Sequence, residues 1–383
     1  MKIQCMHKRA SCTVVTVFAE GQPGFLDFSY RVRSLAANYD VTVISSFPLQ
    51  HAEIDIRGVK YRVIPSPGTR LGWLSYLCRS ALMIFRQRPG FVVLLHSMAS
   101  PVALALPGLK TVTYWNEHPT HVAPCHTGMN PLKKLQRGFI RWLMFHGARR
   151  STRVLPIGEA HRDDLLKHGC DPHKMEMIYM GVDQAFHKAA LENTNPDQGF
   201  LNLVYIGSVH PERGRDVMLE AVALANTAQK IVHLTMVGAS EEQLQYCQEA
   251  VARLGIVDSV SLHGRVPGSR IPEFLKTADI GLCLWQDLPW YRFNPPTKLF
   301  EYLVAGLPVA ASNIRTHTQY VQDGVNGFIF EYGSQSLAAC IQKIFENRHR
   351  LPELKRNTCE TSKPYLWPSI EPAFLAAISR AAA

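Results

Sequence analysis

Short apolar segments rich in β-branched residues alternate with helical periodicity through the second half of the chain, and this alternation constrains the fold most strongly. Strands are predicted there at residues 201–209, 231–237, 259–263, 279–284, 308–311 and 327–330. Helices are predicted at residues 215–226, 241–254, 271–277, 297–304, 318–322 and 335–347. Strands that are apolar on both faces and are joined through helices form a parallel sheet covered on both sides.

The first half shows the same α/β pattern less regularly. Strands are predicted at residues 12–19, 41–47, 60–64, 91–96, 111–115, 153–156 and 175–179. The length of 383 residues suits two domains. We predict a first domain at 1–188, a polar linker at 189–200, a second domain at 201–360 and a terminal segment at 361–383 that crosses back to the first domain. Because ligands bind beyond the carboxyl ends of parallel strands, two such sheets would face one central cleft.

Positive charge is concentrated in the first half. Residues 1–190 contain 24 Lys and Arg against 12 Asp and Glu, a net charge of +12, whereas residues 191–383 contain 17 against 19, a net charge of −2. An excess confined to one half favours a domain that faces an anionic surface, such as a membrane or a lipid phosphate. A nucleic acid is not expected as a partner, because no recognised binding module accompanies the basic residues.

No segment has the uninterrupted apolar length that a membrane-spanning helix needs. Residues 12–19 follow Lys2, Lys8 and Arg9, yet the run is short and contains two threonines. We therefore predict a buried first strand rather than a signal peptide. The nine cysteines include no Cys-x-x-Cys pair, which indicates free thiols in a reducing compartment. These features favour a cytoplasmic protein that associates peripherally with the inner face of a membrane.

Four segments of the chain carry motifs. The first combines residues 153–166 with Met-Gly-Val-Asp at 180–183, and the second is Gly-Ser-Val-His-Pro-Glu-Arg-Gly at 207–214. The third, at 295–310, begins Pro-Pro-Thr-Lys-Leu-Phe-Glu-Tyr, and the fourth, at 323–330, is Asp-Gly-Val-Asn-Gly-Phe-Ile-Phe. A glycine turn between a strand and a helix presents backbone N–H groups and a helix N-terminus to an anion, although backbone geometry alone also explains such a turn.

In this order the four segments resemble motifs of the GT-B glycosyltransferases, specifically glycosyltransferase family four, in which the last segment is a hairpin. The resemblance is dense over residues 150–347 and loose over the first half. It implies two Rossmann-like α/β domains that face a central cleft. The second domain would hold a nucleotide diphosphate-sugar, and the first would hold the acceptor.

The resemblance also implies a donor site. Arg213 stands at the position of the family's phosphate-loop lysine, and Lys298 supplies a second cation, so both are catalytic candidates as well. Glu301 matches the glutamate that accepts both ribose hydroxyl groups. The implied donor-binding residues are Gly207, Ser208, Arg213, Gly238, Thr297, Lys298, Leu299 and Glu301.

Two positions depart from the family's pattern. Ser208 stands where an arginine is usual, and Phe293, next to Asn294, stands where a glutamate usually contacts the donor sugar. Asp287 lies upstream and offers another carboxylate, although capping a turn is its simpler role. The sequence therefore does not specify the donor sugar.

Polar residues end the strand predicted at 111–115. His118 aligns with the family's acceptor-side histidine, and the resemblance implies a catalytic contact with the donor hexose. Glu117 and His121 compete for this role, and a purely structural role for His118 is a further alternative. Gly21 and Gly24 follow the first strand and resemble the family's glycine-rich loop near the diphosphate, although a plain turn explains them equally.

Residues 131–146 are predicted to form an amphipathic helix. At 3.6 residues per turn, one face carries Leu132, Leu135, Phe139, Trp142 and Leu143, and the opposite face carries Lys133, Lys134, Arg137 and Arg141. A helix that packs its apolar face on the core and solvates its basic face is one interpretation. Because basic and aromatic helices of this kind lie on anionic bilayers, we expect Lys133, Lys134, Arg137, Arg141 and Trp142 to contact membrane or acceptor.

The function that the resemblance implies is retaining transfer of a hexose-type sugar. The donor would be UDP- or GDP-linked. The basic first domain favours a lipid-linked (polyprenyl-diphosphate) or other glycan as the acceptor, as in cell-surface polysaccharide biosynthesis. No further cofactor and no metal are expected, since the chain has no Asp-x-Asp motif. Two alternatives stay open: a catalytically silent paralogue that binds nucleotide-sugar or lipid, suggested by Ser208 and Phe293, and a nucleotide-sugar 2-epimerase.

Overall fold

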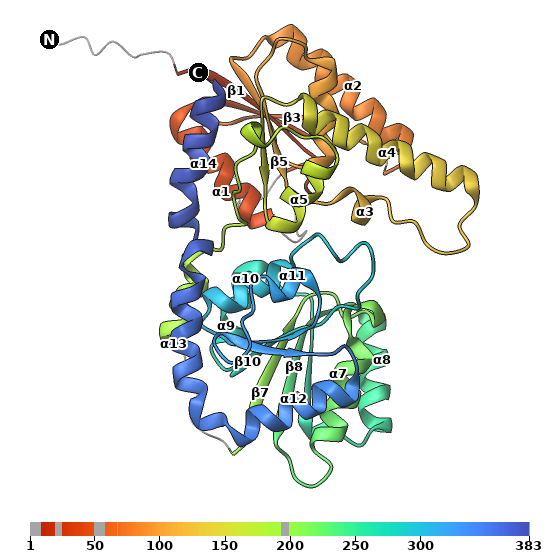
Figure 1. The fold of residues 1–383 in the computed structure, drawn as a ribbon, viewed down its shortest axis with the longest axis vertical. Helices are drawn as coiled ribbons and strands as arrows, with labels where there is room; N and C mark the ends of the chain where they lie inside the picture. The colour runs from red at the N-terminus through yellow and green to blue at the C-terminus, as the bar shows by residue number, and fades with distance from the viewer. Residues whose placement is uncertain (1–8, 20–24, 50–57, 67, 193–198, 383) are drawn as a thin grey trace, which may run out of the picture. The chain divides into compact units, whose positions relative to one another are not determined.

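The computed structural model describes residues 9–19, 25–49, 58–66, 68–192 and 199–382. The chain divides into two compact units. The first comprises Met1–Met180 together with Pro368–Ala383, and the second comprises Gly181–Trp367. Each unit contains a six-stranded parallel sheet with helices packed against it (Figure 1), as the alternating sequence pattern predicts.

The sheet of the first unit has the order β3-β2-β1-β4-β5-β6. Its strands are β1 (Ser11–Thr16), β2 (Asp40–Ser45), β3 (Lys60–Val63), β4 (Phe91–Leu94), β5 (Thr111–Trp115) and β6 (Arg153–Pro156). The helices are α1 (Phe25–Asn38), α2 (Arg70–Gln87), η1 (Ser97–Ala105), α3 (Pro119–Val122), α4 (Pro131–Arg150), α5 (Glu159–Lys167) and η2 (Pro172–Lys174). The central strands β1 and β4 are buried on both faces, as a parallel sheet between helices requires.

The sheet of the second unit has the order β12-β11-β10-β7-β8-β9. Its strands are β7 (Leu201–Ile206), β8 (Val232–Ala239), β9 (Val260–Gly264), β10 (Ile280–Cys283), β11 (Val309–Ser312) and β12 (Gly327–Phe330). The main helices are α6 (Gln184–Glu192), α7 (Arg215–Ala225), α8 (Glu241–Arg253), α9 (Ile271–Leu275), α10 (Thr297–Val304), α11 (Arg315–Thr318), α12 (Ser334–Glu346) and α13 (Leu351–Ser362). Helices α7 and α12 pack together, and α10 packs with α6 and α13.

The last helix, α14 (Trp367–Ala382), belongs almost entirely to the first unit. The hydroxyl of Ser34 in α1 donates a hydrogen bond to Glu371 of α14. Near the end of the chain, Arg380 pairs with Glu176. These contacts tie the terminal helix to α1 and to the segment after η2 in the first unit.

The unit boundaries differ from the predicted linker and domain ends. The expected linker at 189–200 lies inside the second unit, because residues 184–192 form α6, which packs on α9 and α10. Ala189 of this helix is buried, and a Cβ atom on Gly306 would lie 2.9 Å from the Cβ atom of Ala190. The second unit continues to Trp367 rather than ending at 360, since α13 also packs on α10.

Two local predictions are wrong. Residues 175–179 form no full strand, because only Met175 bridges to Val154, after which Ile178 N–H donates to the Pro156 carbonyl at 3.0 Å. The segment 323–330 is not a hairpin: it forms a turn closed by the Gly324 N–H on the Gly327 carbonyl at 2.8 Å. Strand β12 then pairs in parallel with β11.

Candidate functional site

Two glycines bring together the turn that follows β7 and the last residues of β8. Gly207 has a φ angle of 125° and Gly238 one of 115°, values that residues with a side chain rarely adopt. A Cβ atom on Gly238 would lie 2.6 Å from the carbonyl oxygen of Gly207, and one on Gly207 would lie 3.3 Å from Nζ of Lys298. The glycines therefore let the turn after β7 approach both the end of β8 and the first turn of α10.

Lys298 lies at this point with its ammonium group unpaired. Nζ lies 3.4 Å from the centre of the Tyr205 ring. The residue is 8% exposed, and Nζ has no hydrogen-bond acceptor among the described residues. Burial lowers the pKa of Lys298 to about 7, a shift that Arg213 increases and that Cys283 and Glu301 oppose. Because a buried, unpaired cation is costly, an anion that reaches Nζ is stabilised.

Glu301 follows one turn later on α10. Its side chain is half-buried. Burial raises the pKa of its carboxyl group to about 7, against the opposing charge of Lys298. Within the described part of the chain its carboxylate has no hydrogen-bond or ion-pair partner. A carboxylate of this kind is available as an acceptor for hydroxyl groups of a ligand.

Arg213, in η3 (Pro211–Arg213), lies over two aromatic rings. Its guanidinium carbon is 4.7 Å from the centre of the Trp285 ring and 5.1 Å from that of Tyr291. The two rings stack with their centres 4.8 Å apart. Stacking orients the planar guanidinium, while its N–H groups meet no carboxylate among the residues that the structure describes.

The helices α7 and α10 begin at the same edge of the sheet without a side-chain cap. The N-cap of α7 is Gly214, with a φ angle of 80°, and that of α10 is Pro296. Uncapped first-turn N–H groups and the helix dipole attract an anion. Thr297 is the first residue of α10 and is half-buried. With Lys298 and Arg213, these helix ends make this edge suitable for a phosphate or diphosphate.

Of two further predicted donor residues, Leu299 offers only its backbone, whereas the side chain of Ser208 is exposed. Leu299 is fully buried in the core, so its side chain cannot contact a ligand. The carbonyl oxygen of Ser208 accepts a hydrogen bond from the Tyr205 hydroxyl at 2.9 Å. The sequence analysis did not identify Tyr205 and Trp285, whose rings lie against Lys298 and Arg213. An aromatic residue at the carboxyl end of a buried strand is the pattern that could have indicated them.

His118 is 1% exposed and both of its ring nitrogens are engaged. Nδ1 accepts the backbone N–H of Thr120 at 3.2 Å, which caps α3. The proton therefore resides on Nε2, which donates to Asp164 Oδ2 at 2.8 Å. Burial lowers the pKa of His118, although Asp164 opposes the shift. In this structure both ring nitrogens of the predicted catalytic histidine are therefore used in hydrogen bonds within the first unit.

The two alternatives to His118 are paired with each other. Nδ1 of His121 and the carboxylate of Glu117 form a hydrogen bond. Burial raises the pKa of Glu117, but the hydrogen bond and charge of His121 outweigh burial and lower it below its usual value. Gly21 and Gly24, the predicted glycine loop, lie outside the described residues.

Helix α4 does not bury the apolar face that the core-packing interpretation places against the core. Four of the five residues of its predicted apolar face are exposed: Leu132 by 62%, Leu135 by 71%, and Phe139 and Trp142 by 50% each. The fifth, Leu143, is half-buried and packs against the core. Lys133 and Lys134 are exposed as well. The other two basic residues are not on a solvated face, since Arg141 donates to the Ala123 carbonyl at 2.6 Å and Arg137 is half-buried.

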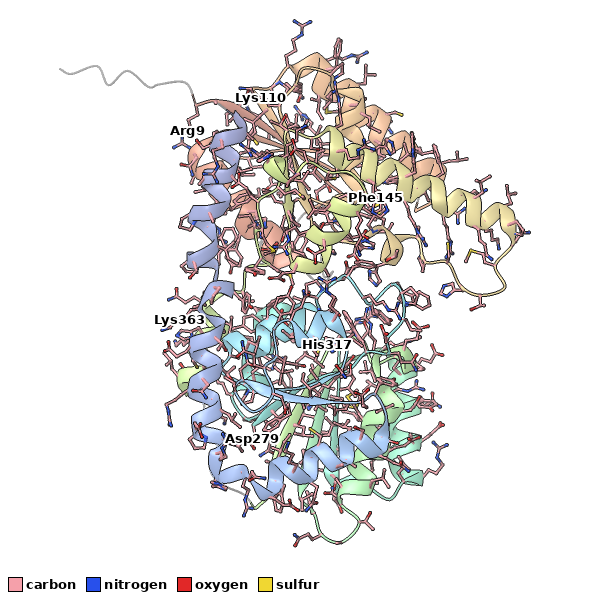
Figure 2. The ribbon with its side chains drawn as sticks, in the orientation of Figure 1. Arg9, Lys110, Phe145, Asp279, His317 and Lys363 are labelled. Carbon is pink, nitrogen blue, oxygen red and sulfur yellow. The ribbon has the colours of Figure 1, made fainter. Side chains whose placement is uncertain are left out.

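Gly147 explains which face of α4 packs against the core. A Cβ atom on Gly147 would lie 2.3 Å from the backbone of Ser100, so α4 meets η1 backbone to backbone at this residue. Met144 is fully buried on the same side, and Phe145, labelled in Figure 2, stacks on His168 with ring centres 3.7 Å apart. Arg137 precedes Met144 by seven residues, close to two turns, and therefore shares its inward face.

Among the described residues, no group of three or more His, Cys, Asp or Glu side chains is placed to hold a metal ion. The cysteines in this part of the chain are free thiols. No described helix combines the length and apolar character that crossing a bilayer requires.

Two family models match the chain in succession. The one described as Glycosyltransferase Family 4 matches residues 30–186, and the one described as Glycosyl transferases group 1 matches residues 188–361. Two parallel six-stranded sheets covered by helices are the architecture of the GT-B class. The chain belongs to this superfamily, as a member of the family-four, group 1 glycosyltransferases.

Curated relatives are similar over part of their length. D-inositol 3-phosphate glycosyltransferase 2 of Catenulispora acidiphila is 24% identical over 57% of this chain and 53% of its own. The amylovoran biosynthesis glycosyltransferase AmsK of Erwinia amylovora is 24% identical over 50% of this chain and 47% of its own. The chain thus spans about half the length of these relatives.

Solved structures share the whole fold at low identity. Anabaena HepE, in complex with UDP and glucose, superposes with a TM-score of 0.73 at 15% identity, covering 97% of this chain and 100% of HepE. Sucrose-phosphate synthase of Thermosynechococcus elongatus superposes with a TM-score of 0.75 at 14% identity, covering 97% of this chain and 98% of its own. These likenesses establish the fold.

Proposed function

We propose that the protein is a retaining glycosyltransferase that moves a hexose-type sugar from a nucleotide diphosphate-sugar to a lipid-linked or other glycan acceptor. The observation that carries this proposal is the buried, unpaired ammonium group of Lys298 beside the uncapped start of α10. The relatives' names support it, since AmsK acts in amylovoran biosynthesis. HepE has been crystallised with UDP and with UDP-glucose, so UDP-sugars are the first donors to test.

In this proposal the second unit binds the donor. Lys298, Arg213 and the helix ends hold the diphosphate, whose negative charge grows as it leaves the sugar. Interactions that strengthen with this developing charge lower the barrier rather than only tightening binding. Glu301 accepts the ribose hydroxyl groups, which fixes the donor's position relative to Lys298.

The transfer step exchanges two bonds at the anomeric carbon. The bond to the diphosphate oxygen breaks, and a bond to the acceptor hydroxyl oxygen forms on the same face of the sugar. The hydroxyl proton moves to the departing diphosphate, which acts as the base. This route needs no dedicated side-chain base, in agreement with the engagement of His118 by Asp164 and Thr120.

The proposal includes docking on the anionic inner face of a membrane. Helix α4 exposes the apolar residues Leu135, Phe139 and Trp142 as well as Lys133 and Lys134. On α2, which Figure 1 shows beside α4, Leu71 and Phe85 are also exposed. Exposed aromatic and aliphatic side chains among lysines suit an interface with anionic lipid.

A donor screen with an activity arm tests the proposal. UDP-, GDP- and ADP-hexoses are first compared by thermal shift, because a ligand that binds only the folded state raises the apparent stability. Radiolabelled donors are then incubated with membrane extract, with and without excess chelator. We expect one donor to bind and to be transferred, with the chelator without effect. Binding without transfer would indicate the silent paralogue, a new nucleotide-sugar formed without acceptor would indicate an epimerase, and no binding would refute the donor site.

A further inference from the structure

A cavity lies within the first unit beneath α2 and α4. Its volume is about 380 Å³, within the range of small-ligand sites. Trp73, Met98 and Ile140 supply apolar wall, and no acidic residue occurs among the described residues that line it. Helices α2 and α4 are tied together at its rim by a hydrogen bond from Arg70 to Gln136.

Two polar atoms of this cavity are buried without partners. Nη1 of Arg137 and Oγ of Ser46 each lack a hydrogen-bond partner among the described residues, and both residues line the cavity. A buried donor left unsatisfied costs free energy that a ligand acceptor recovers. Arg137 comes from α4 and Ser46 follows β2, and acceptor atoms of one ligand that fills the cavity would satisfy both.

The other polar wall groups are already satisfied or neutral. Nε1 of Trp73 donates to the Met98 carbonyl at 3.1 Å. Nδ1 of His96 accepts the Met98 N–H at 3.1 Å, and burial lowers the pKa of His96 to about 4, so the ring is neutral at pH 7. The positive charge available to a ligand therefore comes from Arg137, with Arg70 at the rim.

We propose that this cavity binds a phosphate ester whose other end is an apolar chain, with the phosphate at Arg137 and Ser46. The inference rests on the proposed function and specifies the lipid anchor of its acceptor as a lipid phosphate. The same helix carries Arg137 inward and Leu135 and Phe139 outward. The headgroup and first carbons fill the cavity, and the remaining chain continues into the bilayer on which the outer face of α4 lies.

The test uses the full chain and farnesyl phosphate below its micelle concentration, with farnesol and inorganic phosphate as partial probes. Titration calorimetry should show farnesyl phosphate binding at least about 10-fold more tightly than farnesol or inorganic phosphate. Only farnesyl phosphate can both accept hydrogen bonds from Arg137 and contact the apolar wall. Arg137→Gln should weaken farnesyl phosphate binding about 10-fold or more, and Arg137→Lys should weaken it less. Arg150→Gln, at an exposed position on α4, makes the same change of charge and should leave the affinity unaltered.

Nucleotide binding is measured on the same samples. Removing the unsatisfied guanidinium should not lower the melting temperature of Arg137→Gln, so a lost affinity would not reflect unfolding. Equal binding of farnesol and farnesyl phosphate, equal binding of inorganic phosphate, or an unaffected Arg137→Gln variant would each overturn the inference. If farnesyl phosphate behaves as expected but no nucleotide binds, the donor assignment fails and the lipid-phosphate site stands.

Discussion

The ammonium nitrogen of Lys298 lies 3.4 Å from the centre of the Tyr205 ring. It also lies next to Gly207, where a Cβ atom would be only 3.3 Å from this nitrogen. The negative face of the ring offsets part of the cost of burying the cation. It supplies no hydrogen-bond acceptor, so the ammonium protons stay unsatisfied until an anion arrives. The fold thereby holds an unpaired amino group at the start of α10 at the expense of stability.

Replacing Lys298 tests this relationship. Lys298→Met should weaken binding of a nucleoside diphosphate by roughly 10- to 100-fold, the range of a lost charged hydrogen bond. The melting temperature should hold or rise, because an unpaired buried charge is removed. Calorimetry and thermal unfolding measure the two effects, with Lys343→Met on the exposed face of α12 as the control. An unchanged affinity would place the diphosphate elsewhere.

Glu301 should confer preference for a ribose. The wild type is expected to bind a ribonucleoside diphosphate about 10-fold more tightly than its 2′-deoxy analogue, since the analogue leaves the carboxylate without one donor. In Glu301→Gln this ratio should shrink. Glu220→Gln, an exposed change on α7, should preserve it. A deoxy analogue that binds the wild type as well as the ribonucleotide would remove Glu301 from the ribose site.

Nucleotide affinity should peak near pH 7. Burial lowers the pKa of Lys298 to about 7, and a bound diphosphate favours the charged lysine, so affinity falls as pH rises above this value. Burial raises the pKa of Glu301 to about 7, and only the carboxylate accepts two hydroxyl groups, so affinity also falls below it. Titrations between about pH 6 and 9 measure both limbs. Lys298→Met should lose the alkaline limb and Glu301→Gln the acidic limb; a flat wild-type profile would contradict both assignments.

Two glycines of α4 should respond oppositely to alanine. Gly147→Ala places a Cβ atom 2.3 Å from the Ser100 backbone and should reduce the free energy of unfolding by about 1–3 kcal/mol. Gly138→Ala meets no atom within 4 Å and should increase it by up to about 1 kcal/mol through helix propensity. Denaturant unfolding measures both changes. Destabilisation of equal size at both positions would argue against the close approach of α4 and η1.

The exposed face of α4 should control membrane binding. Phe139→Ser with Trp142→Ser should lower partitioning onto vesicles rich in phosphatidylglycerol by about 10-fold or more, from lost apolar burial. Lys133→Glu with Lys134→Glu should act similarly, since each basic residue contributes about 1 kcal/mol near such a surface. Val257→Ser, exposed in the second unit, should have no effect. Co-sedimentation at several salt concentrations measures this, and a wild type indifferent to lipid charge would refute the docking surface.

The second unit followed closely from its sequence. Its strands are short apolar runs separated by helices, so local periodicity was enough to predict a parallel sheet. The candidate donor residues Thr297, Lys298 and Glu301 lie on one helix, where spacing alone relates them. The spacing did not reveal that the ring of Tyr205, on strand β7, would lie next to the ammonium group of Lys298.

The first unit shows what only tertiary structure decided. A period of 3.6 residues per turn predicts that α4 is amphipathic. Which of its faces meets the core depends on the close approach of Gly147 to Ser100, a contact between segments far apart in the chain. Likewise, the engagement of His118 depends on Asp164 from α5. Sequence periodicity determines which residues share a face of a helix. Long-range packing decides which face turns inward, and it is packing that places Arg137 in a cavity and leaves Phe139 exposed.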